Sequence, residues 1–488
     1  MRLNYIANAL GLILMDVGIV SFVPILVALY YQEWSSLLSF FAAGIFAVAL
    51  GDILRKSDKN SSDVDELNDI KRSEALVVAS LTWGVFSIIA AIPFLFFGFS
   101  PIDSLFEAVS GITTTGATIL TSFDIPKSLL FWRSFTQWLG GMGIVVLFVA
   151  ILPQFAVAGR QMFYAEAPGP TEEKFTPRIK NTASALWLVY AGLTLLCTIC
   201  LWIAGMNPFD AICNAMSTLS AGGFSPNPES IGGYHSNAIV YIVLAFMFIA
   251  GASFVVQSKV LTKMNPTLFW KSEEFRFYTK IIIFVSLLLG CFLYFENHYS
   301  ISHSLTASFY QVLSLSTTTG SSSENYHLWS LDAKLILFLS MFLSSCAGSA
   351  GGGVKMTRWL LICKYIRNEM YKILHPNAVM SIKIDNVSVS SVVIKQTIFF
   401  MLCYFGIFAL TAFLITLIEK NLVIGTTSAI ASLGDIGPAF GSVIGPMGNY
   451  SSLKVVTKVI FILNMLIGRL EIIPFLVLFQ KETWKIKK

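Results

Sequence analysis

Long apolar runs alternate with short basic loops along the 488 residues of this chain. Two runs come first, at about residues 5–31 and 36–54, and the loop that joins them contains no lysine or arginine. Eight more follow in four pairs: about 74–98 with 131–152, 184–206 with 237–261, 277–295 with a run that begins near 334, and 387–418 with 455–479. Because about 20 apolar residues cross a bilayer as a helix, the pattern predicts ten membrane spans.

Each pair of runs encloses a shorter apolar segment, which begins near residue 101, 208, 302 or 424. The first of them, residues 101–113, is too short to cross the membrane. Pro101 and Pro208 suit the first turn of a helix, where proline loses no intrahelical hydrogen bond. We therefore expect four half-length helices, each of which enters the membrane and returns as a re-entrant loop.

Lysines and arginines are grouped around residues 55–72, 160–180, 259–280 and 364–383 and at the C-terminus. Basic loops usually face the cytoplasm, and two predicted spans separate each basic loop from the next. Both termini are therefore expected in the cytoplasm, with the re-entrant loops entering from outside. The first apolar run is too long for a cleaved signal peptide, which favours a retained span.

The predicted fold is an all-α integral membrane protein, built from span–pore loop–span repeats with pseudo-symmetry around a central pore. The chain then divides into two N-terminal spans (1–54), a cytoplasmic loop (55–73), four pore repeats (74–158, 184–263, 276–370 and 387–480) and a basic cytoplasmic tail (481–488).

Composition supports the membrane interpretation and excludes several functions. The chain is 55% hydrophobic and 12% charged, with a mean hydropathy of +0.71, so it has too few polar groups to cover a soluble globule of this size. The net charge of +5 lies in loops, which argues against nucleic-acid binding. Cys197 and Cys200 have the spacing of metal ligands, but they lie in an apolar run without a second pair, which favours core thiols.

A threonine-rich turn follows the first short segment, and residues 110–118 recur almost unchanged as residues 314–322. Related turns follow the second and fourth short segments. Aligning the turns places Gly116, Gly222, Gly320 and Gly437 in register, at separations of 106, 98 and 117 residues. A unit of about a hundred residues that occurs four times implies a pseudo-fourfold arrangement, and four loops that meet on one axis make a pore.

Such turns gather backbone carbonyls and hydroxyls where water is scarce, which is the chemistry of removing water from a small cation and coordinating it again. Glycine permits positive φ and close backbone approach, and the C-terminus of a short helix favours a cation. One such turn alone is equally compatible with an ordinary helix bend, but four aligned copies favour a filter. The predicted filter residues are Thr114, Thr115, Gly116, Ser220, Ala221, Gly222, Thr318, Thr319, Gly320, Asp435, Ile436 and Gly437.

These turns, together with residues 138–143, 348–355 and 468–471, resemble the Trk/Ktr/HKT superfamily of potassium transporters over nearly the whole chain. The two extra N-terminal spans make the chain most similar to the bacterial Trk membrane subunit. In that superfamily, glycine at all four filter positions accompanies potassium selectivity, whereas Asp435 stands where asparagine is common. The resemblance implies K⁺ held at the carbonyls of Thr115, Ala221, Thr319 and Ile436.

The same resemblance implies potassium uptake across the cytoplasmic (inner) membrane of a bacterium, with K⁺ as the transported ion and no cofactor in this chain. It also implies a cytosolic regulatory subunit with nucleotide-binding domains, for NAD or ATP, and a homodimer of this chain.

Glycines cluster within the second run of the third pair, at residues 348–353. Each costs about 1 kcal/mol relative to alanine in a helix, so the helix should break there, next to protein or a water-filled cavity. A small-residue helix-packing face is the alternative, although such faces usually space their glycines. A phosphate-binding loop is excluded because Val354 stands where its lysine must be. The resemblance implies an intramembrane gate of Gly348, Ser349, Ala350, Gly351, Gly352, Gly353 and Lys355.

Arg469 lies inside the last apolar run, where an unpaired arginine costs about 3 kcal/mol. Glu471 points to a different helix face and is not its obvious partner. We expect Arg469 to project below the filter and to form, with the glycine cluster, a barrier to cations. The alternative is a structural pair with a carboxylate elsewhere.

A secondary transporter for an organic solute, built on broken helices, is the competing class of function. It predicts two repeats of about five spans and two interrupted helices, and four similar turns argue against it. The chain shows no catalytic constellation, because its histidines form no metal or nucleophile motif, so an enzyme is not expected.

Overall fold

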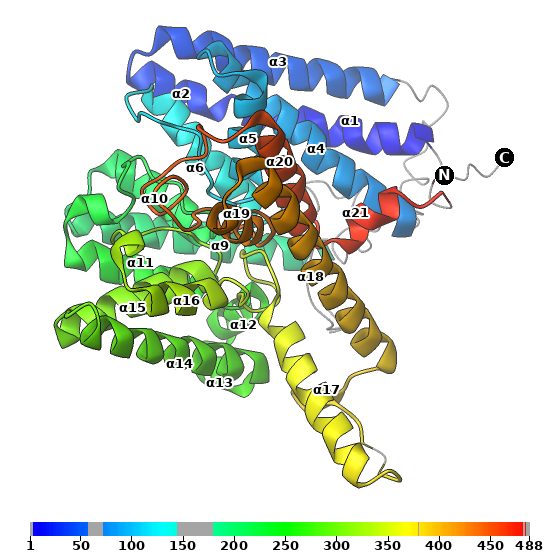
Figure 1. Cartoon of the computed structure of the whole chain (residues 1–488). Coiled ribbons are helices and arrows are strands. Elements are labelled where there is room, and N and C mark those ends of the chain that lie inside the picture. Colours follow the sequence, from blue (N-terminus) through cyan, green and yellow to red (C-terminus); the bar gives the residue numbers. More distant parts are fainter. Residues whose placement is uncertain (1–2, 57–71, 144–178, 379, 482–483, 485–488) are drawn as a thin grey trace.

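The computed structural model describes residues 3–56, 72–143, 179–378, 380–481 and 484, and this part is mostly helical (Figure 1). Within it, the strands are β1 (Lys383–Ile384) and β2 (Val387–Ser388), which pair antiparallel as a short hairpin. Most of the predicted cytoplasmic loop 55–73, the end of the run 131–152, most of the basic loop 160–180 and most of the tail lie outside the described residues.

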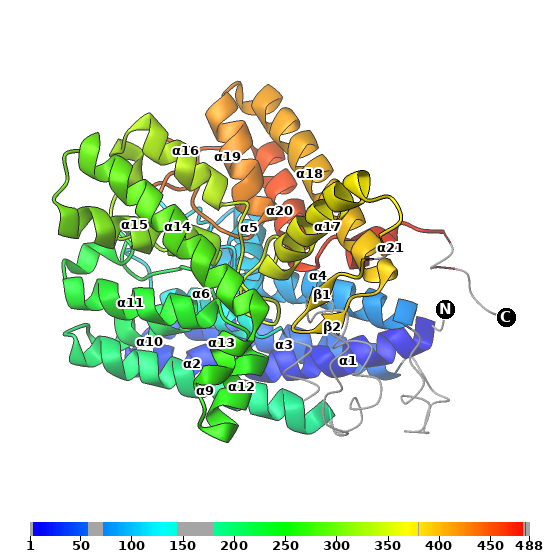
Figure 2. The same ribbon diagram turned by 90° about the horizontal axis from the view of Figure 1, so that it is seen from below.

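The N-terminal helices lie along one edge of the molecule (Figures 1 and 2). They are α1 (Leu3–Val20), α2 (Val23–Tyr30) and α3 (Trp34–Lys56). The backbones of α1 and α3 nearly touch, because a Cβ added at Gly11 would lie 2.6 Å from the Gly51 carbonyl oxygen. Small residues at a helix contact permit this approach in membranes, where no hydrophobic force drives helices together.

Four units of similar construction follow. Each has a long helix, a short helix, an extended turn and a second helix that ends or breaks. The units are α4 (Arg72–Phe96), α5 (Pro101–Ile112) and α6 (Lys127–Gly141); α9 (Ile179–Ile203), α10 (Pro208–Leu219), α11 (Asn237–Ala250) and α12 (Phe254–Lys263); α14 (Glu273–Phe295), α15 (Ile301–Ser316), α16 (Leu331–Ser340) and α17 (Met356–Leu374); and α18 (Ser391–Glu419), α19 (Leu422–Leu433), α20 (Val455–Arg469) and α21 (Ile473–Leu478). The short helix α13 (Thr267–Lys271) joins the second and third units.

Side-chain caps start each of the four short helices. Ser100 and Ser300 accept hydrogen bonds from the backbone N–H groups of Asp103 (3.1 Å) and His303 (3.3 Å). Asn207 and Asn421 cap α10 and α19 in the same way, since each side-chain oxygen accepts a hydrogen bond from a backbone N–H group of the first helical turn. Serine and asparagine are favoured at this position because their oxygens satisfy N–H groups that lack a helical partner. The short segments predicted from the sequence are therefore true helices, with bounds within two residues of those expected.

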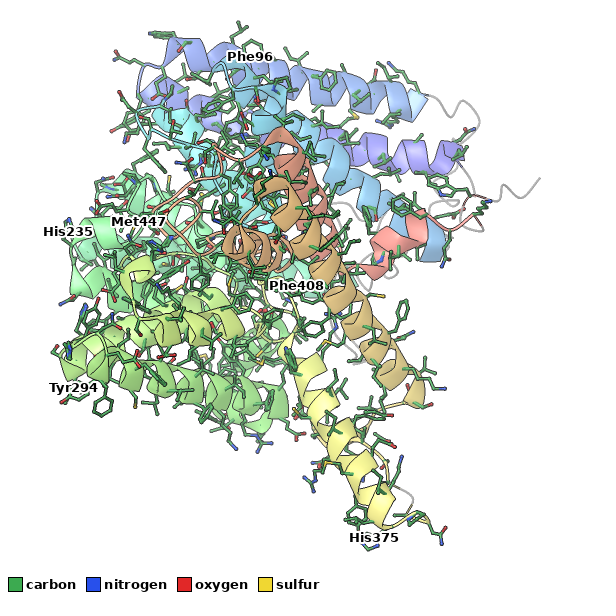
Figure 3. The ribbon with its side chains drawn as sticks, viewed as in Figure 1. Phe96, His235, Tyr294, His375, Phe408 and Met447 are labelled. Carbon is green, nitrogen blue, oxygen red and sulfur yellow. The ribbon has the colours of Figure 1, made fainter. Side chains whose placement is uncertain are left out.

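The described part contains six helices that are long and apolar enough to cross a membrane, and the bent pair α11 and α12 passes the same test together. Large apolar side chains such as Phe96 and Tyr294 lie at the periphery (Figure 3), and both are about half exposed. Such a surface suits lipid, so the chain is a multi-pass membrane protein.

The second run is interrupted in each of the last three units. Residues 341–355, here named the glycine loop, separate α16 from α17, as the glycine cluster predicted. Two further interruptions were not predicted. A bend of 97° separates α11 from α12 at residues 251–253, and α20 ends before Glu471 and Ile472, both of which have positive φ. No glycine cluster marks these two positions, so local composition gave little sign of them.

Candidate functional site

Each short helix ends in a turn with the same backbone path. Turns 1 to 4 are residues 113–118, 220–225, 317–322 and 434–439. In every turn the second residue has positive φ: Thr114 (58°), Ala221 (56°), Thr318 (60°) and Asp435 (55°). The fourth residue is a glycine, also at positive φ: Gly116 (83°), Gly223 (71°), Gly320 (72°) and Gly437 (96°).

Backbone hydrogen bonds confirm this alignment. In turn 1, the N–H groups of Thr115 and Gly116 both point to the carbonyl oxygen of Ser110. In turn 2, the N–H groups of Gly222 and Gly223 make the same pair of contacts with Ser217. Turns 3 and 4 repeat the pattern, with acceptors Ser314 and Ala431.

The predicted register of turn 2 is therefore wrong by one residue. Gly223, not Gly222, is equivalent to the other three turn glycines, and Ser220 is equivalent to the helix-capping residue Thr113. The carbonyl that corresponds to those of Thr115, Thr319 and Ile436 belongs to Gly222 rather than to Ala221. The error arose because two glycines are adjacent in this turn, and Ala221 adopts a left-handed conformation that the sequence does not signal.

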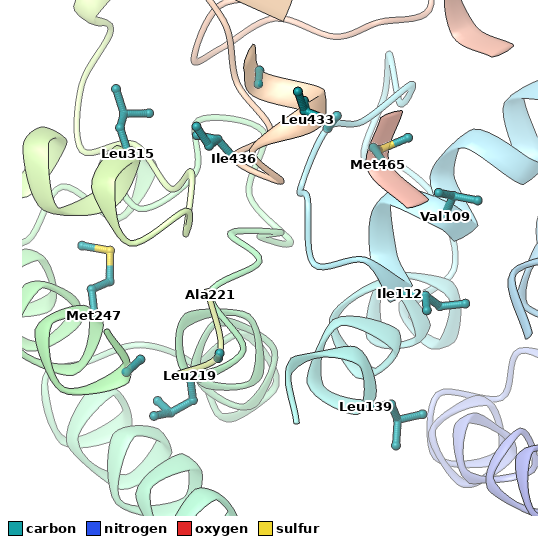
Figure 4. Close-up of a cluster of buried hydrophobic side chains, with 14 of the residues drawn as sticks. Val109, Ile112, Leu139, Leu219, Ala221, Met247, Leu315, Leu433, Ile436 and Met465 are labelled. Carbon is teal, nitrogen blue, oxygen red and sulfur yellow. The ribbon is translucent and has the colours of Figure 1, made fainter. Parts of the chain in front are cut away.

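The four turns close into a ring. A Cβ added at Gly116 would overlap the Gly222 carbonyl oxygen, and one added at Gly223 would overlap that of Thr319. A Cβ added at Gly320 would likewise overlap the Ile436 carbonyl oxygen, and one added at Gly437 would overlap that of Thr115. Each turn thus touches the next one, and turn 4 returns to turn 1. Figure 4 shows the turns converging, with Ala221 and Ile436 among the buried side chains around them.

This ring has a clear chemical capacity. Four equivalent carbonyl oxygens lie around a common centre, each against a glycine that leaves room for it. Such oxygens can replace the hydration shell of a monovalent cation. Glycine is required at these positions because any side chain would collide with fixed backbone and would be strained at positive φ.

Hydroxyl and carboxyl groups connect turns 1 and 4. The Thr115 hydroxyl donates to Asp435 Oδ1 over 3.0 Å and lies 2.7 Å from the Thr113 hydroxyl. Asp435 is fully buried, and its second oxygen, Oδ2, has no hydrogen-bond partner among the described residues. Asp435 thus lies beside the ring with one carboxyl oxygen that makes no described hydrogen bond.

Two polar residues of α6, Gln137 and Arg133, contact turn 2. Neither of them was assigned a functional role from the sequence. Gln137 donates from Nε2 to the Gly222 carbonyl (2.7 Å) and accepts from the Phe224 N–H (3.1 Å). The Arg133 guanidinium lies over the Phe224 ring, 4.1 Å from its centroid. Polar side chains within an apolar run are uncommon, and their presence in residues 131–152 could have indicated a supporting role.

A buried ion pair lies behind turn 1. Arg133 Nε is 2.7 Å from Glu107 Oε1, and both side chains are almost completely buried. Glu107 also accepts hydrogen bonds from the Thr118 hydroxyl and the Ile119 N–H, so its carboxylate orders the chain just after the turn. Glu107 stands inside the first short segment, where a charged residue could have been noticed.

Replacing Glu107 with alanine is expected to destabilise the protein by about 3–5 kcal/mol, because the Arg133 charge would remain buried without its partner. Thermal unfolding of the purified protein in detergent measures this effect as a lower Tm. The matched control is Asp52→Ala, which removes an exposed pair with Lys56 (Asp52 side chain 42% exposed, Lys56 75%) and should change Tm little. Equal shifts for both variants would contradict the role assigned to Glu107.

The glycine loop lies directly against turns 3 and 4. The Gly352 N–H donates to the Thr318 hydroxyl (2.8 Å), and a Cβ added at Gly352 would lie 2.9 Å from Asp435 Oδ2. Lys355 is 3% exposed and donates to the carbonyl of Gly351 within the loop. The loop folds back on itself and supplies the acceptors of this ammonium group, the carbonyls of Ser349 and Gly351.

Arg469 connects three parts of the site. From the end of α20 its Nη1 donates to the Thr114 hydroxyl (3.1 Å) and to the Ala350 carbonyl of the glycine loop (2.9 Å), and its Nη2 donates to the Gly140 carbonyl at the end of α6. Glu471 accepts instead from Arg358, consistent with its different direction. The guanidinium thus lies between turn 1 and the glycine loop.

One titratable pair lies in the segments outside the long helices. Glu324, four residues after the glycine of turn 3, lies 3.2 Å from His303 at the start of α15. Burial raises the pKa of the Glu324 carboxyl, and the neighbouring imidazole opposes this shift. The pair is separate from the ring and touches none of its carbonyl groups in the described contacts.

Comparison with known proteins agrees with this geometry. The family model TrkH, described as a cation transport protein, matches residues 36–486. A relative from Salmonella typhimurium strain LT2, "Trk system potassium uptake protein TrkH", is 36% identical over 99% of this chain and 100% of its own length. "Trk system potassium uptake protein TrkG" from Escherichia coli K12 is 30% identical over 95% and 94%, respectively. The crystal structure of the potassium transporter TrkH from Vibrio parahaemolyticus superposes with a TM-score of 0.88, at 30% identity, over 99% of this chain and 100% of that one.

Proposed function

This chain belongs to the TrkH family of cation transport proteins, and on that premise we propose that it takes up potassium ions across the cytoplasmic membrane of a bacterium. The observation that carries the proposal is the closed ring of four turns, in which each glycine borders the next turn's carbonyl oxygen. The relatives named above are potassium uptake proteins, and they match this chain over nearly its full length.

In this proposal the filter consists of the second to fourth residues of each turn, with K⁺ coordinated by the carbonyls of Thr115, Gly222, Thr319 and Ile436. The ion exchanges its water shell for these oxygens and for those of neighbouring ring residues. The membrane potential drives uptake, since it supplies about 2.3 kcal/mol per charge for each 100 mV. Asp435 adds attraction for the cation on the side of the ring that faces the glycine loop.

The glycine loop and Arg469 form the gate. The loop lies against turns 3 and 4, and the guanidinium lies beside turn 1, so a cation that leaves the ring on this side meets backbone and a positive charge. Lys355, buried in the loop, adds a second positive charge. Conduction then requires the loop to move away from the turns, while Arg469 releases the Ala350 carbonyl.

The proposed topology has ten spans and four re-entrant loops, with both termini in the cytoplasm. We further propose that a cytosolic subunit with nucleotide-binding domains, for NAD or ATP, regulates the gate and that the chain forms a homodimer. Support comes from α17, which continues directly from the glycine loop and extends beyond the other helices (Figure 1), and from the β1–β2 hairpin, which contacts α17 through the bond from Lys364 to the Lys383 carbonyl. A partner that binds there would act on the loop through the helix.

Flux of ⁸⁶Rb⁺ or K⁺ into liposomes that contain the purified chain tests the function. We expect K⁺ or Rb⁺ uptake to follow an imposed negative-inside potential. This uptake should exceed Na⁺ uptake, because the ring supplies four carbonyl oxygens rather than a coordination site sized for a smaller ion. Protein-free liposomes are the control. Absence of monovalent cation flux under any potential, with the regulator present, would instead favour a secondary transporter of an organic solute built on broken helices.

A further inference from the structure

The glycine loop is held at both of its ends by hydrogen bonds to neighbouring segments. At its first end, the Cys346 N–H donates to the Gly251 carbonyl and the Phe254 N–H donates to the Gly348 carbonyl, each over 2.9 Å. These two bonds join the loop to the break between α11 and α12. At its second end, the Met356 N–H donates to the Ser345 carbonyl over 3.0 Å, which closes the loop on itself.

A single carboxylate oxygen holds both ends together. Glu274 Oε1, on the first turn of α14, accepts from the Ala347 N–H (2.7 Å) and from the Thr357 N–H (3.0 Å). It also accepts from the Thr357 hydroxyl. Ala347 and Thr357 stand ten residues apart, just before and just after the segment that lies against the turns. Hydrogen bonds to an ionised acceptor are about twice as strong as neutral ones.

The middle of the loop, residues 349–352, is here named the tip. Among the described contacts it makes one hydrogen bond to the turns, from the Gly352 N–H to the Thr318 hydroxyl, and it accepts one from Arg469 of α20 at the Ala350 carbonyl. Its other hydrogen bonds stay within the loop: Ser344 and Lys355 donate to the carbonyls of Gly352 and Gly351, and the Ser349 hydroxyl donates to that of Ser345. Gly348 and Gly353 flank the tip, and both have positive φ (73° and 64°). Glycine rotates about such positions at low energetic cost, so the tip has a hinge at each end.

We propose that Glu274 is a positioning residue of the gate: it clamps both ends of the glycine loop, so that opening moves only the tip about Gly348 and Gly353. This inference rests on the proposed function, because it assigns the loop to cation passage. The clamp keeps the tip in register with turns 3 and 4 and returns it there after each opening. Without the clamp, the ends separate and the tip leaves the turns more often.

The neighbouring carboxylate provides a matched control. Glu273 lies on the same helical turn, but it pairs with Lys364 of α17 (2.5 Å) and contacts the hairpin residue Asp385 rather than the glycine loop. Loss of Glu273 therefore removes a negative charge at the same depth while leaving the clamp intact.

Basal ⁸⁶Rb⁺ flux of the full chain in liposomes, without any regulator, tests the proposal. Glu274→Ala should raise this flux about tenfold, since loss of one hydrogen bond to a charged group shifts an equilibrium by at least that factor. Glu274→Gln keeps an acceptor oxygen but loses the charge, so it should give a smaller rise than Glu274→Ala, whereas Glu273→Ala should stay near wild type. Thr357→Val removes only the hydroxyl donor and should give a smaller rise, which keeps the test available if Glu274→Ala folds poorly.

A second readout does not depend on conduction. With Ser349→Cys in the tip, the rate of maleimide modification, measured by mass spectrometry at that position, reports how often the tip leaves the turns. The rate should rise with Glu274→Ala by the same factor as the flux. Equal rates in wild type, Glu274→Ala and Thr357→Val would overturn the clamp, as would equal effects of Glu273→Ala and Glu274→Ala. A wild-type chain without cation flux would contradict the proposed function instead, and the modification rates would still decide about the clamp.

Discussion

Alanine at position 223 is expected to reduce potassium and rubidium flux to the background of protein-free liposomes. Gly223 has φ of 71°, and an added Cβ would overlap the Thr319 carbonyl oxygen of the next turn. That oxygen belongs to the backbone and cannot rotate away as a side chain can, so the ring must open at this contact. The flux assay described above measures the loss, and size-exclusion chromatography shows whether the variant remains folded.

Position 222 supplies the control that separates the two possible registers. An added Cβ at Gly222 would meet the Gln137 side chain, which is flexible, and φ at Gly222 is not positive. Gly222→Ala should therefore impair flux, and Gln137→Ala in the same chain should restore part of it. Gly223→Ala should gain nothing from the second substitution. Rescue of Gly223→Ala, or normal flux through it, would show that the ring is not the conduction path.

Replacement of Arg469 by alanine is expected to raise basal potassium flux about tenfold or more. The guanidinium donates to the Thr114 hydroxyl and to the carbonyls of Ala350 and Gly140, and so it holds the glycine loop against turn 1. Its loss removes these three hydrogen bonds and a positive charge beside the ring. One hydrogen bond from a charged group is worth about 1.5–3 kcal/mol, which corresponds to at least a tenfold shift in the gate equilibrium.

Arg469→Lys tests which of the two effects dominates. Lysine keeps the charge but has no planar fork to reach three acceptors at once. If geometry matters most, Arg469→Lys should conduct nearly as well as Arg469→Ala; if charge matters most, its flux should stay near wild type. Flux unchanged in both folded variants would remove Arg469 from the gate and leave it as a structural contact between α20, α6 and the loop.

Part of this site could be predicted because its signals are local. The length of the apolar runs indicates which helices can lie in a membrane, and the short segments are bounded by residues that cap helices, such as Ser100 and Asn207. The glycine cluster at residues 348–353 predicted the break between α16 and α17 for the same reason, since several glycines in succession disfavour a helix wherever they occur.

The register of turn 2 could not be settled in this way. Gly222 and Gly223 are adjacent, and either can be aligned with Gly116. The deciding fact is that Ala221, rather than a glycine, occupies the left-handed position after α10, because the hydrogen bonds of Gly222 and Gly223 to Ser217 require it. A conformation imposed by such bonds overrides the preference of the residue itself.

From the order of its residues alone, this chain determined its helical segments, its fourfold repetition and the need for glycine in the turns. The helices and the turn glycines depend on near neighbours in the sequence, and the repetition follows from comparing such short stretches with one another. Tertiary structure decided which oxygen meets which glycine, and it brought Gln137 to turn 2, Glu274 to both ends of the glycine loop and Arg469 to Gly140, 329 residues away. These contacts join segments that no local pattern connects. Buried polar groups must find partners wherever the folded chain supplies them, and only the assembled fold shows where that is.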